Sequence, residues 1–139
     1  MPLTNTLRAF FLSLACFTLL GCGNNPVSVE VEQLLKTSET WDGTPYARYS
    51  HGQPEITVVK ITIPANTTLK WHEHPMPNVA YVLSGELLVE IRDSDKKITV
   101  SKGQVLPEVV NTAHRGTSGN EPVELIVFYA GGTGMPLSK

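Results

Sequence analysis

The feature that most constrains the fold of this chain is a succession of short β-branched runs, each closed by proline or by turn residues. The run at 56–63 is rich in Val, Ile and Thr and stops at Pro64. β-branched residues favour strands, and proline cannot continue a hydrogen-bonded ladder. Further strands are predicted at 67–74, 79–83, 86–92, 97–100, 104–110 and 123–129. This spacing, with no long helical pattern, predicts an all-β sandwich or barrel.

The connections between these runs carry ordinary turn chemistry. Ser84-Gly85, 93–96 and Lys102-Gly103 are predicted turns, and 116–120 is predicted as a loop. Residues 27–40 alternate too weakly to decide between an early strand and a short helical turn. The predicted organisation is therefore a signal segment at 1–21, a tether and N-terminal segment at 22–40, and one barrel domain at 41–139.

The first residues read as an export signal. A weakly positive start is followed by a dozen mostly apolar residues, 9–20, which suits a signal-peptide core and is too short to span a bilayer of roughly 30 Å. The run ends in Leu19-Leu20-Gly21-Cys22, which resembles a bacterial lipobox. The alternatives are a plain secretory signal and a buried helix. The resemblance implies cleavage before Cys22 and lipidation of its thiol.

This interpretation has consequences for cysteine chemistry and location. Cleavage removes Cys16 and leaves Cys22 alone, so no internal disulfide is expected. The protein is expected to be exported and lipid-anchored at the bacterial cell envelope. Gly23 after Cys22 resembles outer-membrane sorting signals, which in a Gram-negative cell implies the periplasmic side of the outer membrane.

Charge argues against a nucleic-acid partner. The chain has 11 Lys and Arg against 13 Asp and Glu, and no basic stretch interleaved with aromatic residues. Nucleic-acid binding needs such a basic face. The expected partner is instead a small molecule.

Two histidines stand two residues apart, at His72 and His74. On a strand, side chains at i and i+2 leave the same face, so both imidazoles would enter one space. A third histidine, His114, follows 11 residues after Gly103. Three neutral imidazoles can hold Zn²⁺, Fe²⁺, Mn²⁺ or Ni²⁺ and leave coordination positions open. The alternative is a polar barrel interior without metal.

These residues resemble the two short motifs of the cupin superfamily. His72, His74 and Gly85 match the spacing of the first motif, and Gly103 and His114 match the second. The resemblance spans roughly 55–129. It implies a double-stranded β-helix, or jelly-roll, barrel in which the three histidines bind a divalent metal. Trp-Asp-Gly at 41–43 and Phe-Tyr-Ala-Gly at 128–131 make the chain similar to small quercetin-dioxygenase-like cupins.

The chain also departs from these motifs. The position of the family's glutamate ligand holds Asn78, and the opening glycine of the first motif is Asn66. In the second motif the proline, glycine and closing asparagine positions hold Val109, Asn111 and Ser118. The identity of the fourth ligand of the expected site is therefore undecided from the motifs.

Two side chains are candidates for that place. Asn78 would offer a neutral oxygen or orient a water. Glu108 is a charge within the apolar run 106–110, so it either faces solvent or points at a cation, where it could also act as a catalytic base. Glu73, between the two histidines, should face the other side of its strand.

The resulting functional hypothesis is a metal-dependent enzyme, dioxygenase-like or isomerase-like, acting on a small molecule. The alternatives are a membrane-anchored barrel that binds a ligand or metal without turnover, and a metal-free interaction domain. The cupin resemblance also implies a homodimer. Four further residues are expected to have ordinary roles: His51 as an exposed loop residue, Trp71 and Tyr81 as core or pocket wall, and Arg115 as a surface residue rather than an anion contact.

Overall fold

The computed structural model describes residues 28–49 and 51–139. The predicted signal segment, Cys16 and Cys22 lie outside these residues. Contacts divide the chain into two units, Met1–Val31 and Glu32–Lys139. No helix that could cross a membrane occurs among the described residues.

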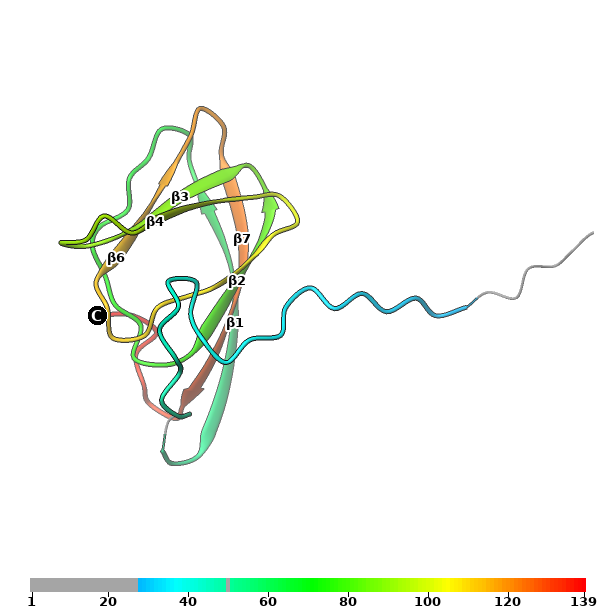
Figure 1. Cartoon of the computed structure of the whole chain (residues 1–139), viewed down its shortest axis with the longest axis vertical. Helices are drawn as coiled ribbons and strands as arrows, with labels where there is room; N and C mark the ends of the chain where they lie inside the picture. The colour runs from blue at the N-terminus through cyan, green and yellow to red at the C-terminus, as the bar shows by residue number, and fades with distance from the viewer. Residues whose placement is uncertain (1–27, 50) are drawn as a thin grey trace, which may run out of the picture. The chain divides into compact units, whose positions relative to one another are not determined.

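The second unit contains seven strands and is all-β, as predicted. The strands are β1 (Pro54–Ile63), β2 (Asn78–Ser84), β3 (Glu86–Ile91), β4 (Lys97–Ser101), β5 (Val105–Pro107), β6 (His114–Ser118) and β7 (Val123–Gly132). They form two antiparallel sheets, one in the order β1-β7-β2-β5 and one in the order β4-β3-β6. The sheets face each other around a closed interior (Figure 1), which is the predicted jelly-roll arrangement.

The core lies between the sheets because buried side chains alternate along the strands. On β7, Val123, Leu125, Val127 and Tyr129 are buried, and the residues between them are more exposed. The facing sheet supplies Leu87 and Val89 from β3 and Val100 from β4. Two inward faces with a period of two residues make the core of a β-sandwich or barrel.

Three sequence expectations about strands were wrong. Residues 67–74 form only isolated bridges at Thr68, His72 and His74, because the segment changes partners from β6 to Val110. The predicted strand 104–110 shortens to β5, whose last residue, Pro107, has no N–H to donate to the ladder. Residues 28–37 form neither strand nor helical turn.

The predicted loop at 116–120 is wrong at its start, since residues 116–118 belong to β6. Gly116 lies in the middle of β6 and pairs opposite Val89 of β3. A Cβ on Gly116 would lie 3.0 Å from the Leu87 side chain. This glycine therefore makes room for a core leucine and does not form a turn.

The motif positions for glycine share one backbone conformation. Gly85 and Gly103 have φ of 77° and 85°, and Asn66 and Asn111 have φ of 52° and 50°. Asparagine is among the few residues other than glycine that adopt positive φ at low cost. Asn66 and Asn111 therefore adopt the same left-handed backbone as Gly85 and Gly103.

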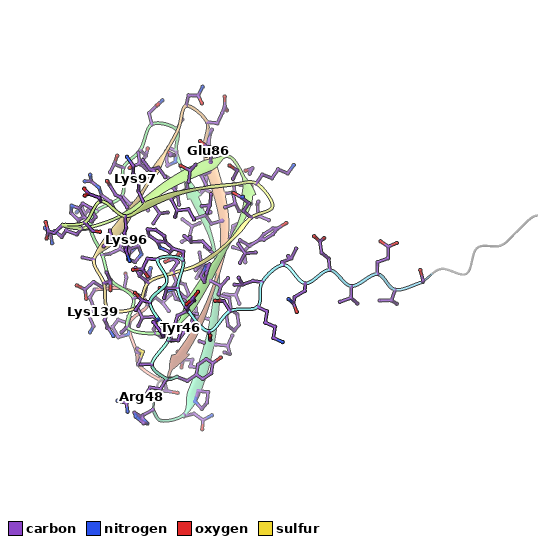
Figure 2. All side chains as sticks on the ribbon, in the orientation of Figure 1. Tyr46, Arg48, Glu86, Lys96, Lys97 and Lys139 are labelled. Atoms are coloured by element: carbon purple, nitrogen blue, oxygen red, sulfur yellow. The ribbon has the colours of Figure 1, made fainter. Side chains whose placement is uncertain are left out.

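The segment before β1 is attached to the end of β5 and to Glu108, which directly follows it. The Trp41 N–H donates to the Pro107 carbonyl at 2.8 Å, and the Tyr46 hydroxyl donates to the Glu108 carbonyl at 3.4 Å. The Lys96 ammonium binds the Asp42 carboxylate at 3.2 Å. Figure 2 labels Tyr46 and Lys96 at this side of the barrel.

Candidate metal centre

Backbone pairing places the three histidines side by side. The His72 N–H donates to the His114 carbonyl and the His114 N–H donates to the His72 carbonyl, both at 3.0 Å. The Asn111 N–H donates to the His74 carbonyl at 2.8 Å. His72 and His74 are thus held by separate bridges, while His114 begins β6.

The three imidazoles converge inside the barrel. One ring nitrogen from each lies within 4.8 Å of the others. Ring centroids are 4.5–5.1 Å apart. His74 and His114 are buried, and His72 is partly buried. The three histidines are positioned to bind a metal.

Each imidazole is oriented by a hydrogen bond from Nδ1 to a backbone carbonyl. The distances are 2.9 Å for His72 to Lys70, 2.6 Å for His74 to Leu137 and 2.8 Å for His114 to Thr112. A carbonyl can only accept, so each Nδ1 carries the proton. In the neutral rings the lone pair is then on Nε2, as in histidines that ligate metals through Nε2.

Two further observations fit a cation. His114 Nε2 is buried and has no hydrogen-bond partner, and a buried polar atom of this kind is expected to have one. Burial also lowers the pKa of His72, and the other two imidazoles add to this effect. His72 is therefore in the neutral form that coordination requires.

The Glu108 carboxylate faces the histidines and not solvent. Its exposed fraction is 9%, and its Oε2 atom lies 3.0 Å from His74 Nε2 and 3.3 Å from His114 Nε2. The contact to His114 lacks hydrogen-bond geometry and is electrostatic. Burial alone would raise the pKa of Glu108, but the two imidazoles lower it to about 2. The carboxylate is therefore ionised.

Asn78 occupies a different position. It is 1% exposed, and its Nδ2 donates to the Met76 carbonyl at 3.5 Å. Its Oδ1 is buried and has no hydrogen-bond partner. Asn78 is not among the residues that line the cavity at the histidines, and it is among those that line an outer groove of about 510 Å³ with Tyr46 and Phe128. The structure thus brings Glu108, but not Asn78, into the lining of the histidine cavity.

The cavity at the histidines is small and mostly apolar. Its volume is about 60 Å³, well below the roughly 300–1,000 Å³ of ordinary small-molecule pockets. Besides the histidines and Glu108, the lining is formed mainly by aliphatic side chains from both sheets, including Leu87, Leu106 and Val127. In this structure the space beside the histidines is therefore small compared with an ordinary substrate pocket.

Tyr129 also lines this cavity, and the sequence reasoning assigned it no role. Its ring contacts His74 edge-on, with centroids 5.4 Å apart. Burial raises its pKa to about 12, and the Glu108 charge adds to the effect. The tyrosine is therefore neutral at physiological pH. A tyrosine on an apolar strand gave no sequence signal beyond packing.

The remaining candidates lie away from the centre. His51 is exposed in a bend. The Arg115 guanidinium stacks on Trp71 at 4.2 Å and its Nε donates to Glu90 at 2.6 Å, so its charge is paired. Tyr81 is a half-buried residue of β2. None of these lines the cavity at the histidines.

Comparisons with known proteins agree with this architecture. A sequence model of the family described as "Cupin domain" matches residues 59–129, slightly more than half of the chain. No curated protein matches the chain.

Solved structures with the same fold include enzymes and an uncharacterized protein. A DMSP lyase structure is 24% identical with a TM-score of 0.53, and the match covers 60% of this chain and 43% of the lyase chain. A DMSP lyase from Ruegeria pomeroyi is 18% identical with a TM-score of 0.53, covering 68% of this chain and 45% of its own. The chain thus spans less than half the length of either lyase.

A third similar structure is closer in size. It is an uncharacterized conserved protein with a double-stranded β-helix domain from Klebsiella pneumoniae. It is 22% identical with a TM-score of 0.51, covering 68% of this chain and 91% of its own. At these identities the likeness shows the fold alone.

Proposed function

Because this chain belongs to the cupin domain family, we propose that it is a metal-dependent enzyme whose three histidines hold one divalent transition metal. The observation that carries the proposal is the shared orientation of the rings. All three Nδ1 atoms donate to carbonyls while one nitrogen of each ring converges on the others. A bound Fe²⁺, Mn²⁺, Ni²⁺ or Zn²⁺ would supply Lewis acidity or, for the redox-active ions, oxygen activation.

The residues around the centre define what the protein itself would contribute. Glu108 holds a fixed negative charge beside His74 and His114 and is in reach to coordinate the ion or to accept a proton from a ligand. Tyr129 and the aliphatic lining limit water around the reacting atoms. We propose a dioxygenase-like or isomerase-like reaction on a small molecule.

A second candidate is a barrel that binds a ligand or metal without turnover. The observation that favours it is the cavity of about 60 Å³, which leaves little room for an organic substrate beside the metal. Turnover of metal-loaded protein with candidate substrates separates the two functions, since both predict a bound metal.

Metal content is the experiment that tests the proposal. The full chain is purified in detergent and analysed for elements beside His72→Ala/His74→Ala, with His51→Ala as the matched control. We expect close to one equivalent of a transition metal in the parent and in His51→Ala, and little in the double variant. Absence of metal from the parent, even after reconstitution, would overturn the proposal.

We also propose that the protein is exported and anchored by a lipid on Cys22. The support is the lipobox-like sequence 19–22. Mass spectrometry of the N-terminal peptide tests it: the expected result is a diacylated cysteine at the new N-terminus. An uncleaved N-terminus, or cleavage elsewhere, would contradict it.

We propose a homodimer formed through the outer face of the β1-β7 sheet. Val58 and Phe128 are opposite each other in the register and are 57% and 41% exposed, and Ile56 is 57% exposed. Clustered apolar side chains on a sheet face are typical of protein interfaces.

A further inference from the structure

The chain after β7 returns to the histidine segment. A turn closes with a hydrogen bond from the Met135 N–H to the Gly132 carbonyl at 3.0 Å, and Gly134 has φ of 77°. Met135 and Leu137 then pack against the hydrophobic core. Figure 1 shows the chain reversing at the end of β7, with the C-terminus on the β6 side of the barrel. Residues 135–139 are called the C-terminal segment below.

The C-terminal segment pairs with the residue between the two neighbouring histidines. The Glu73 N–H donates to the Lys139 carbonyl at 3.2 Å, and the Lys139 N–H donates to the Glu73 carbonyl at 3.0 Å. Lys139 is labelled at this edge in Figure 2. This reciprocal pair, with the packing of Leu137, fixes the segment against the His72–His74 backbone.

The Leu137 carbonyl accepts the ring hydrogen bond of His74, and this bond differs from the other two. His72 and His114 each donate to the carbonyl two residues earlier in their own segments, Lys70 and Thr112. The corresponding carbonyl for His74 is that of His72, which already accepts from the His114 N–H. His74 therefore uses an acceptor 63 residues away, at 2.6 Å.

The bond to Leu137 also decides which ring nitrogen faces the centre. Because Nδ1 is held at the Leu137 carbonyl, Nε2 lies on the side of the cavity, 3.0 Å from Glu108 Oε2. In metal sites the histidine nitrogen that does not coordinate is held by such a hydrogen bond, which orients the ring.

We propose that the C-terminal segment is a positioning element of the metal centre, in which the Leu137 carbonyl holds the His74 ring in the orientation that can coordinate a metal through Nε2. This inference rests on the proposed metal site and adds to it the group that prepares one ligand. It assigns to residues 135–139 a role in metal affinity beyond covering the core.

Two variants test this inference. Deletion of 136–139 removes the acceptor carbonyl. Leu137→Asp keeps the full chain length but places a charge where Leu137 packs against the hydrophobic core, which opposes docking of the C-terminal segment. Leu137→Met is the conservative control. Amide spectra and melting curves first establish that each variant folds; if the deletion does not, Leu137→Asp decides. Zinc affinity is measured by competition with a chelator.

The expected result is a loss of zinc affinity of about 10- to 100-fold in both variants, as for other groups that orient metal-bound histidines, and parent affinity in Leu137→Met. Nitrogen-15 histidine spectra give a second readout. The His74 Nδ1–H signal should be protected from exchange in the parent and lost in the variants, while the His72 signal persists.

Unchanged zinc affinity, or a His74 Nδ1–H that stays protected in folded variants, would overturn the inference. Failure of the proposed function gives a different result. In that case the parent binds no zinc, and the ring spectra of the metal-free protein still show whether Leu137 holds His74.

Discussion

Glu108 Oε2 lies 3.0 Å from Nε2 of His74 inside the barrel. The ionised carboxylate would therefore be in reach to hold a metal together with this histidine. In this chain the negative charge comes from the loop after β5, while the first-motif position for glutamate is Asn78.

Replacing Glu108 by Gln should weaken metal binding by about 10- to 100-fold, because the charge is lost while the shape is kept. Glu73→Gln is the matched control, since Glu73 lies between the two histidines but outside the cavity at the centre. Isothermal titration with Mn²⁺ or Zn²⁺ measures both. Equal affinity in Glu108→Gln and the parent would exclude Glu108 from the metal centre.

Metal binding should release more protons at pH 6.5 than at about pH 8.5. Burial opposes a charge on His74, but Glu108 and the Leu137 carbonyl raise its pKa above the ordinary 6.5. The imidazole is then more than half protonated at pH 6.5, and its proton must leave when Nε2 coordinates. As the pH rises through this raised pKa, His74 is protonated in fewer molecules, so metal binding releases fewer protons.

The proton count is measured by titration calorimetry in two buffers with different ionisation enthalpies at each pH. In Glu108→Gln the pKa of His74 is no longer raised by the carboxylate, so fewer protons should be released at pH 6.5. A pH-independent count in the parent would contradict the prediction.

Gly85→Ala should cost about 3 kcal/mol or more in the free energy of unfolding. At φ of +77° an added Cβ would lie 2.4 Å from the Pro122 carbonyl oxygen, a backbone atom that cannot rotate away. Gly103→Ala is the matched control, because φ is +85° but nothing lies within 4 Å. Gly103→Ala should lower the free energy of unfolding by only about 1–2 kcal/mol, the cost of a left-handed backbone at an alanine. Urea unfolding compares them, and equal costs would refute the steric argument.

Val58→Glu should dissociate the proposed homodimer. A carboxylate in the middle of the apolar outer face would lose its hydration without a partner, which costs several kcal/mol. Sedimentation velocity should therefore show a monomer for Val58→Glu and a dimer for the parent and for Lys97→Glu, a control on β4 in the other sheet. A monomeric parent, or a Val58→Glu variant that stays dimeric, would contradict the proposal.

Local sequence was enough to predict β1 and β7, which pair with each other along their whole length, but not β6, which pairs along its whole length with β3. The β-branched run at 56–63 became β1 because its alternating pattern matches β7 residue for residue. The segment at 67–74 was predicted as one strand and is not, because its hydrogen bonds go in turn to β6 and to Val110. Such a change of partner has no local signal.

The same limit applies to the site. The sequence determined the three-histidine set and the positive-φ turns at the motif positions, because these depend on short spacings and on which residues tolerate a left-handed backbone. Only the tertiary structure decided that Glu108 faces inward, that Asn78 does not line the cavity at the histidines, and that the Leu137 carbonyl orients His74. These relationships join residues far apart in the chain, and closing the barrel is what brings them within hydrogen-bond distance.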